Sequence, residues 1–230
     1  MFYFDPAYFV VMAPALLLSL WASYRTKSAF NKYSKVRATS GLTGAEAARR
    51  LLASAGIDDV EIVRTSGRLS DHYNPATKKL ALSDSVYSQP SIAAIGVACH
   101  EAGHAIQHAS HYAPLWARSV LVPTAGIGSN FGYIVMFLGL IMQIMPLFLL
   151  GAGLFSLVLL FQLVTLPVEF DASARAKRLA FSQGLILDSE RAGVASVLNA
   201  AALTYVAAAV STLLTLLYYL MRSGLLGGRR

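Results

Sequence analysis

Charged residues are scarce in this sequence. Only 13% of its 230 residues are Asp, Glu, Lys or Arg, and 56% are hydrophobic, whereas about a quarter of an average soluble domain is charged. Several apolar windows reach the roughly 20 residues needed to cross a bilayer. We therefore expect an integral membrane protein whose partner is the lipid bilayer. The formal net charge of +7 fits basic flanks of membrane helices better than a nucleic-acid surface, so no nucleic acid is expected.

Cysteine and histidine are also rare. With Cys99 as the single cysteine, no internal disulfide is possible. Cys99 lies about 100° around a helix from the adjacent His100, and we interpret it as a small core residue and not as a metal ligand. Four of the five histidines fall between His100 and His111. This concentration argues against a coincidental motif in that segment.

The clustered histidines include an H-E-x-x-H pattern. His100 and His104 are four residues apart and share one face of a helix, where two imidazoles can bind one tetrahedral zinc ion. A catalytic zinc also needs a third protein ligand and keeps one position for water. Glu101 lies beside the first histidine, where its carboxylate can take a proton from that water. The pattern therefore predicts a zinc site with Glu101 as the catalytic residue.

Four apolar segments are expected to cross the membrane. The first lacks the basic n-region of a cleaved signal peptide, and basic residues follow it from Arg25 onward. This charge bias places the N-terminus outside and the following residues in the cytoplasm. The expected spans are residues 8–24, 120–142 with a break near Gly126, 147–168 ending at Pro167, and 194–221. We divide the chain into a transmembrane anchor (1–24), a cytoplasmic metalloprotease unit (25–118), a transmembrane hairpin (119–168), a cytoplasmic helix (169–193), and a fourth transmembrane helix with its tail (194–230).

The predicted fold is mainly α, with about four transmembrane helices and a small α+β zinc-peptidase-like unit built around the H-E-x-x-H helix. In that unit, Thr43 to Glu46 form a capping box. Turn residues 74–77 indicate a hairpin. We expect a helix over 45–54, a strand over 60–63, a hairpin of 68–73 with 79–82, and the motif helix, with Pro90 just inside its N-terminus behind a cap at Ser88 or Gln89.

The neighbouring histidines do not supply the third ligand. His108 shares the face of the paired histidines, but it lies roughly 9 Å along the helix axis from their midpoint, too far for zinc–nitrogen bonds of about 2 Å. An extended H-E-x-x-H-x-x-G-x-x-H pattern also fails, because Gln107 and Ser110 stand where it requires glycine and histidine. We interpret His108 and His111 as residues of the helix end or interface.

Glu169 is the better candidate for the third ligand. The hairpin of the second and third apolar segments returns the chain to the membrane side that it left, so Glu169 reaches the face of the two histidines. Asp171 points about 200° away from it on a helix, and pairs with Arg175 or orients a histidine. Alternatively, both acids only cap a helix whose N-terminal dipole favours acids. Glu190 is a further candidate ligand.

Together these residues resemble the YugP-like family of bacterial membrane-bound neutral zinc metallopeptidases. The similarity covers nearly the whole chain, through the leading anchor and residues 71–75, 100–104 and 166–173. A more distant similarity is to HtpX-like and prenyl-protein membrane proteases, which place a glutamate ligand in E-x-x-x-D. Glu169 matches that glutamate, but Ser173 stands in place of the aspartate. The resemblance implies peptide-bond hydrolysis at a bacterial inner membrane.

We therefore expect a zinc-dependent endopeptidase that acts on a peptide or membrane protein, with zinc on His100, His104 and Glu169. The strand at 68–73 or 79–82 is expected to pair with an extended substrate, and His72 or Tyr73 to donate a hydrogen bond to the developing oxyanion.

Two other functions compete with this one. The first is a scaffold that uses zinc only for stability, although structural zinc sites usually have four protein ligands. The second is a transporter, which the near absence of ionisable residues in the apolar segments disfavours.

Overall fold

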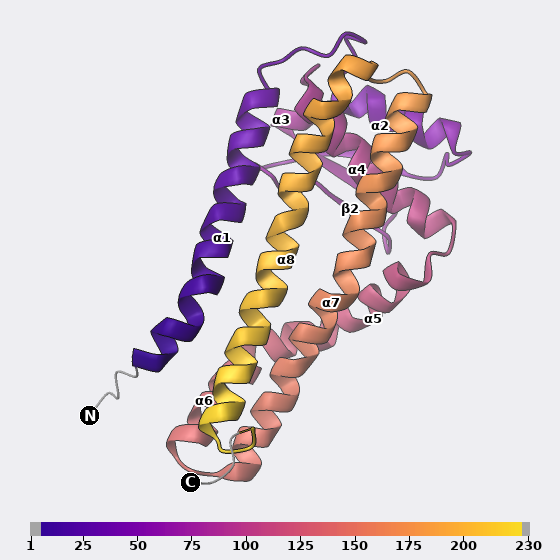
Figure 1. The fold of residues 1–230 in the computed structure, drawn as a ribbon. Coiled ribbons are helices and arrows are strands. Elements are labelled where there is room, and N and C mark those ends of the chain that lie inside the picture. Colours follow the sequence, from indigo (N-terminus) through magenta and orange to yellow (C-terminus); the bar gives the residue numbers. More distant parts are fainter. Residues whose placement is uncertain (1–5, 227–230) are drawn as a thin grey trace. The chain divides into compact units, whose positions relative to one another are not determined.

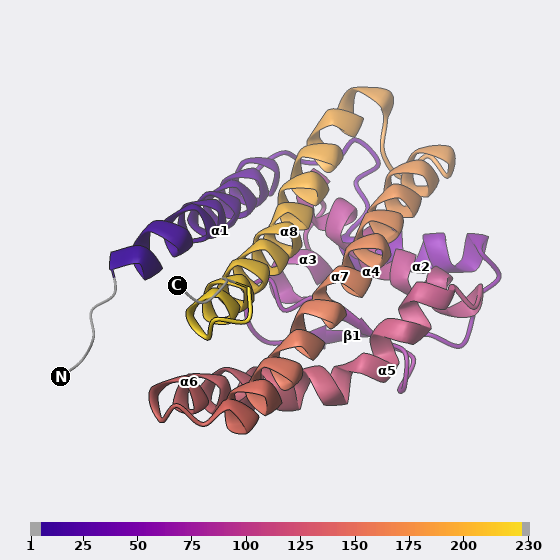
Figure 2. The same cartoon turned by 60° about the horizontal axis from the view of Figure 1, so that its bottom comes forward.

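The computed structural model describes residues 6–226, whose regular elements are helices and one three-stranded sheet. Four helical segments of this range are long and apolar enough to cross a membrane, judged by length and composition. They are α1 (Pro6–Tyr33), the segment Ala113–Ile141 formed by α5 and α6, α7 (Met145–Ser182), and residues 188–222, which contain α8 (Arg191–Arg222). Figures 1 and 2 show α7 and α8 as long continuous ribbons. The predicted helical class with four apolar helices is confirmed.

Contacts divide the chain into two compact units. Among the described residues, the first unit comprises 6–23, 117–166 and 204–226, and the second comprises 24–116 and 167–203. Each of the helices α1, α5, α7 and α8 contributes residues to both units.

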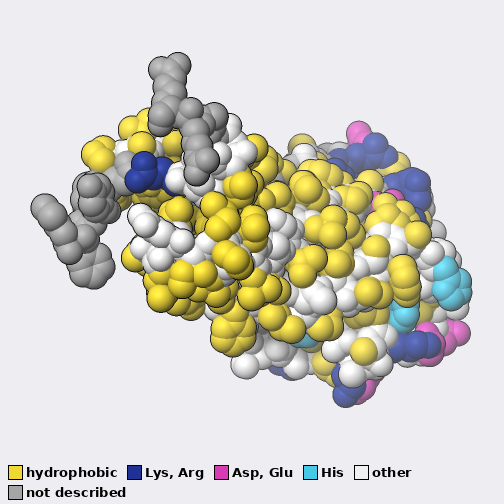
Figure 3. Space-filling model, turned by 90° about the horizontal axis from the view of Figure 1, so that it is seen from below, with side chains coloured by type: hydrophobic (Ala, Val, Ile, Leu, Met, Phe, Trp, Pro, Cys, Tyr) yellow, Lys and Arg dark blue, Asp and Glu magenta, His cyan; other side chains and the backbone are white. Residues whose placement is uncertain are grey.

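The first unit is built from apolar helix segments in close contact. Its core contains Met136, Phe148 and Tyr219. A Cβ atom added at Gly139 of α6 would lie 2.2 Å from the backbone nitrogen of Phe148, so only glycine allows these two backbones to approach so closely. Many large hydrophobic side chains of this unit, such as Phe131 and Ile141, are exposed, and hydrophobic side chains predominate on the face shown in Figure 3. A lipid environment accounts for such a surface.

The second apolar segment contains a change of helix type. α5 (Ala113–Ile127) is followed by one π-helical turn (Gly128–Gly132) and then α6 (Tyr133–Ile141). The segment therefore begins earlier than residue 120, and its irregularity lies at Gly128 and not at Gly126. Gly128 is in tight contact with α7, because an added Cβ atom would lie 2.3 Å from the carbonyl oxygen of Leu154.

α7 does not end at Pro167, and that prediction is wrong. The helix continues to Ser182, and the exposed Pro167 lies inside it. Proline removes one backbone donor but leaves the turns that follow free to form. Those turns bury a stripe of small residues at helical spacing in the core of the second unit, namely Val168, Ala172, Ala176 and Ala180. This packing outweighs the local preference of proline for a helix end, and it places Glu169 inside a regular helix.

The second unit has an α+β core. It contains α2 (Gly44–Ser54), β1 (Glu61–Thr65), β2 (His72–Asn74), β3 (Lys79–Ser83), α3 (Asp84–Tyr87) and α4 (Ile92–Ala109). The strand order is β1-β3-β2, with β3 parallel to β1 and antiparallel to β2. The predicted hairpin is present, although its first strand begins at His72. The predicted capping box is also present, because Thr43 and Glu46 bond reciprocally at the start of α2.

α4 is the central helix of this unit. Most of its side chains are buried, including Ile95, Ala98 and Ala102. Its N-cap is Ser91, whose side chain accepts from the backbone nitrogen of Ala94, so the expected cap at Ser88 or Gln89 is wrong. Pro90 lies outside the helix, and its carbonyl accepts a hydrogen bond from Ala38.

Candidate metal centre

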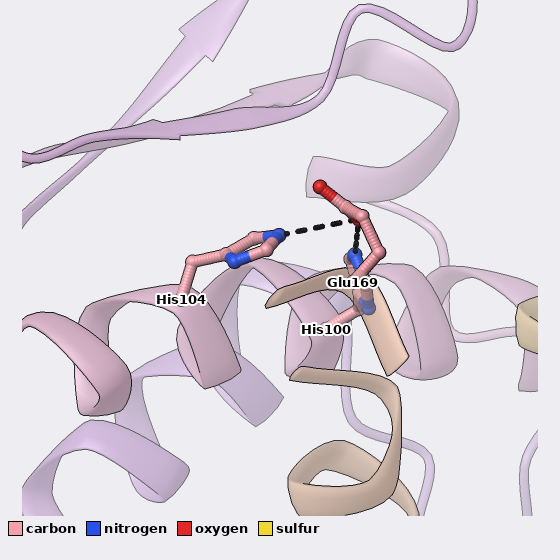
Figure 4. A group of neighbouring side chains, drawn as sticks. All are labelled: His100, His104 and Glu169. Carbon is pink, nitrogen blue, oxygen red and sulfur yellow. Dashed lines mark hydrogen bonds and ion pairs between the residues drawn. The ribbon is translucent and has the colours of Figure 1, made fainter. Parts of the chain in front are cut away.

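The three predicted metal ligands meet between α4 and α7. The Nε2 atom of His100 lies 3.1 Å from Oε2 of Glu169, and Nε2 of His104 lies 3.6 Å from the same oxygen. Each of the three residues has one potential ligand atom, and these three atoms all lie within 4.8 Å of one another. In Figure 4 both rings of α4 point toward the Glu169 carboxylate. The site is enclosed, since Glu169 is 1% and His104 6% exposed.

The second nitrogen of each imidazole is also held. Nδ1 of His100 lies 3.1 Å from Oγ of Ser173, and Nδ1 of His104 lies 3.0 Å from Oε1 of Gln107. When Nδ1 donates to these oxygens, the proton is on Nδ1 and the lone pair is on Nε2. In that tautomer each Nε2 atom has a lone pair that could bind a metal ion together with the Glu169 carboxylate.

This donor set fits zinc. Two neutral imidazole nitrogens and one carboxylate form a three-ligand set that leaves a fourth position open, as in catalytic zinc sites. Hydrogen bonds from the outer ring nitrogens are typical of metal-binding histidines. Burial of the His104 ring lowers its pKa, but the contact with Glu169 and the charges of Glu101 and Glu169 outweigh burial and raise the pKa above its usual value. The negative charges near His104 therefore favour a cation at this site.

Comparison with known proteins agrees with this geometry. Residues 8–224 match the model of the family described as "Putative neutral zinc metallopeptidase". The chain is 48% identical over 207 residues to "Putative membrane protease YugP" of Bacillus subtilis (strain 168), covering 90% of this chain and 92% of that protein. The chain belongs to this zinc metallopeptidase family. No solved structure gives a significant match.

Glu101, which the sequence predicts to be the catalytic residue, lies next to the ligand group. It follows His100 on α4 and is 8% exposed. Within residues 6–226, no side chain or backbone group forms a hydrogen bond or ion pair with its carboxylate. Its charge nevertheless acts on His104. Glu101 is therefore close to the ligands and is not engaged by another residue.

The sequence alone does not show that Gln107 and Ser173 are hydrogen-bond partners of the two histidines. In the sequence, Gln107 is only a mismatch to a longer zinc motif, and Ser173 is only a departure from E-x-x-x-D. Ser173 is the residue that bonds to His100, so a hydroxyl takes the position of the aspartate. Asp171 pairs with Arg175 at 2.5 Å, as one of the two expected arrangements requires, and also accepts from Gln107 at 2.8 Å. Gln107 follows His104 by three residues, and residues at this spacing are neighbours on a helix. This spacing is the signal in the sequence that could have indicated the contact.

The remaining candidates lie outside the group of three. Glu190 accepts hydrogen bonds from the backbone nitrogens of Thr39 and Leu187 and from the Thr39 hydroxyl. This arrangement joins two loops and explains why Glu190 is buried. Cys99 is fully buried, and burial raises its pKa to about 12, which disfavours the thiolate that metals bind.

The two residues expected to contact the oxyanion have other partners. Nδ1 of the exposed His72 lies 2.9 Å from the carbonyl oxygen of Ser70. The hydroxyl of Tyr73 lies 2.8 Å from Nδ1 of His108, and burial raises the pKa of Tyr73. The Tyr73–His108 bond ties β2 to α4 one turn after His104. Neither residue belongs to the ligand group, and an oxyanion role for them stays a prediction.

Proposed function

We propose that this zinc metallopeptidase is a membrane-embedded endopeptidase in which Glu101 is the general base. The main support is the position of the Glu101 carboxylate, which has no hydrogen-bond or ion-pair partner among residues 6–226 and is close enough to His104 to act on its charge, next to three converging ligand atoms. His100, His104 and Glu169 would hold the metal. When bound, zinc would act as a Lewis acid that lowers the pKa of a coordinated water to about 7.

The protein's own residues account for the proton transfers. The Glu101 carboxylate accepts a proton from the attacking water and delivers it to the leaving amine nitrogen. Glu169 and the two imidazoles are held by α7 and α4, so they cost little reorganisation during the reaction. The low exposure of His104 and Glu169 excludes competing water from the side of the site that they form.

We also propose that the edge of β2 binds the substrate main chain. The expected alternative, the strand at 79–82, is wrong, because β3 is the central strand and is paired on both sides. β2 pairs only with β3 among the described strands, and Tyr73 links it to α4. An extended peptide that adds to this edge gains backbone hydrogen bonds without a requirement for a particular side chain. The substrate class is thus an unfolded segment of a peptide or membrane protein.

The proposed location is a bacterial inner membrane with the site at its cytoplasmic face. The support is the series of basic residues that begins at Arg25, in the second half of α1. Positive charge concentrates on the cytoplasmic side of membrane helices.

The test compares zinc content and hydrolysis of casein by detergent-purified wild type, Glu101→Gln and Glu61→Gln. Glu61 is an exposed acid on β1 that pairs with Lys79 and serves as the control. Glu101→Gln should retain zinc and lose at least about 10²-fold in activity, while Glu61→Gln stays active. If Glu101→Gln retains both zinc and full activity, the proposed mechanism is wrong. If the wild type binds zinc and cleaves nothing, a zinc-stabilised scaffold is the better account.

A further inference from the structure

Gln107 occupies a fully buried position between the two helices of the zinc site. Its exposed fraction is 0%. Its Nε2 lies 2.8 Å from the carbonyl oxygen of Val168 and 2.8 Å from Oδ2 of Asp171, and its Oε1 lies 3.0 Å from Nδ1 of His104. One side chain of α4 therefore bonds both to a zinc-ligand candidate on its own helix and to two groups of α7.

The partners determine how the Gln107 amide is oriented. A backbone carbonyl and a carboxylate oxygen only accept hydrogen bonds, so the amide NH₂ must face Val168 and Asp171. The amide oxygen must then face His104. Because an oxygen acceptor needs a donor, Nδ1 of His104 carries a proton, which leaves Nε2 as the nitrogen that can bind a metal. The hydrogen-bond pattern on α7 therefore selects the tautomer of a histidine on α4.

The same side chain fixes the third ligand. Val168 and Asp171 lie on either side of Glu169 in the chain, so both Gln107 donor bonds hold the turn that carries it. Asp171 is in turn held by Nε of Arg175 at 2.5 Å. A run of polar contacts therefore extends from Arg175 through Asp171 and Gln107 to His104.

We propose that Gln107 is a positioning residue, which sets the tautomer of His104 and holds the Glu169 turn of α7 against α4. The proposal rests on the zinc site of the proposed function, but it does not depend on the reaction. Only an amide of this length supplies both an acceptor and two donors here. Glutamate lacks the donors, methionine lacks both, and asparagine is one methylene shorter.

The test measures zinc affinity by competition with a chromophoric chelator, in full-length protein in detergent micelles. The variants are Gln107→Met, Gln107→Glu, Asp171→Asn and the double variant Gln107→Glu/Asp171→Asn. Gln183→Glu, at an exposed glutamine, is the control. Gln107→Met should weaken zinc binding by about ten- to a hundredfold. In Gln107→Glu, the introduced carboxylate faces the carboxylate of Asp171, so this variant should also bind zinc weakly.

The double variant distinguishes positioning from simple loss of packing. The amide introduced at position 171 donates to the carboxylate at position 107, so the hydrogen bond is restored with reversed polarity. Zinc affinity should recover by about fivefold or more relative to Gln107→Glu alone. A double variant that binds no better than Gln107→Glu would overturn the proposal, as would Gln107→Met with wild-type affinity.

A second measurement reads the tautomer directly. Nitrogen-15 NMR of histidine-labelled protein without added zinc should show His104 protonated at Nδ1 in the wild type and in Gln183→Glu. In Gln107→Met the signal should shift toward the Nε2-protonated form. An unchanged tautomer contradicts the proposal even if zinc affinity falls. Because neither readout is hydrolysis, a wild type that binds zinc but does not cleave would refute the proposed function and leave this inference intact.

Discussion

A Cβ atom added to Gly103 of α4 would lie 2.8 Å from the backbone carbonyl oxygen of Ala172 in α7. Real Cβ atoms essentially never lie so close to another heavy atom, so this contact requires glycine. Gly103 adjoins His104, and Ala172 follows Glu169 by three residues. The small residue inside the H-E-x-x-H motif therefore sets the helix separation at which the carboxylate of α7 reaches both imidazoles of α4.

Gly103→Ala should weaken zinc binding. Alanine is the better helix former by about 1 kcal/mol, but overpacking typically costs about 1–3 kcal/mol, and the helices must separate to relieve the clash. We expect a lower melting temperature and a zinc dissociation constant raised about tenfold or more. Gly153→Ala, at a helix glycine of α7 with nothing within 4 Å of its added Cβ atom, should leave zinc binding unchanged. Equal affinities for the two variants would show that the close contact does not matter.

Ser173 should tune the basicity of His100. Removing its hydroxyl in Ser173→Ala leaves Nδ1 without its acceptor and should weaken zinc binding by about tenfold. Ser173→Asp introduces a carboxylate acceptor, which increases the basicity of the ligand and should bind zinc at least as tightly as the wild type. Competition titrations measure both variants, with exposed Ser182→Ala on the same helix as the control. Wild-type affinity in Ser173→Ala would contradict this role.

Glu190 should matter for stability and not for zinc. Glu190→Gln weakens the hydrogen bonds to Thr39 and Leu187, and we expect the free energy of unfolding to fall by about 1–3 kcal/mol. Metal analysis of the purified variant should still give the wild-type zinc content, whereas Glu169→Gln should lose zinc. Loss of zinc from Glu190→Gln with Glu169→Gln still loaded would reverse the assignment of the third ligand.

Cys99 should be unreactive in the folded protein. It is fully buried, and burial raises its pKa to about 12, so almost no thiolate is present at pH 8. A maleimide reagent should label the native protein slowly and label it stoichiometrically after denaturation, as mass spectrometry would show. Cys99→Ala should bind zinc normally. Rapid native labelling, or zinc loss in that variant, would mean that the thiol is exposed or ligates the metal.

Local features of the site were predictable from the sequence, whereas contacts between helices were not. The placement of His100 and His104 on one face follows from helix geometry alone. Glu169 could be inferred because a membrane hairpin returns the chain to the same side. Gln107 could not, since its partners depend on the register between α4 and α7. The continuation of α7 through Pro167 was missed for the same reason, because the buried stripe beyond it becomes visible only once the core is formed.

X-ray absorption spectroscopy at the zinc edge would show whether zinc is bound by two histidines and one carboxylate. For the purified wild type, we expect a first shell of nitrogen and oxygen atoms at about 2.0–2.1 Å, with outer-shell scattering from two imidazoles. Glu169→Ala should lose one of these light atoms or lose the metal. A sulfur shell at about 2.3 Å, or scattering from fewer than two imidazoles, would show that the ligands are not His100, His104 and Glu169.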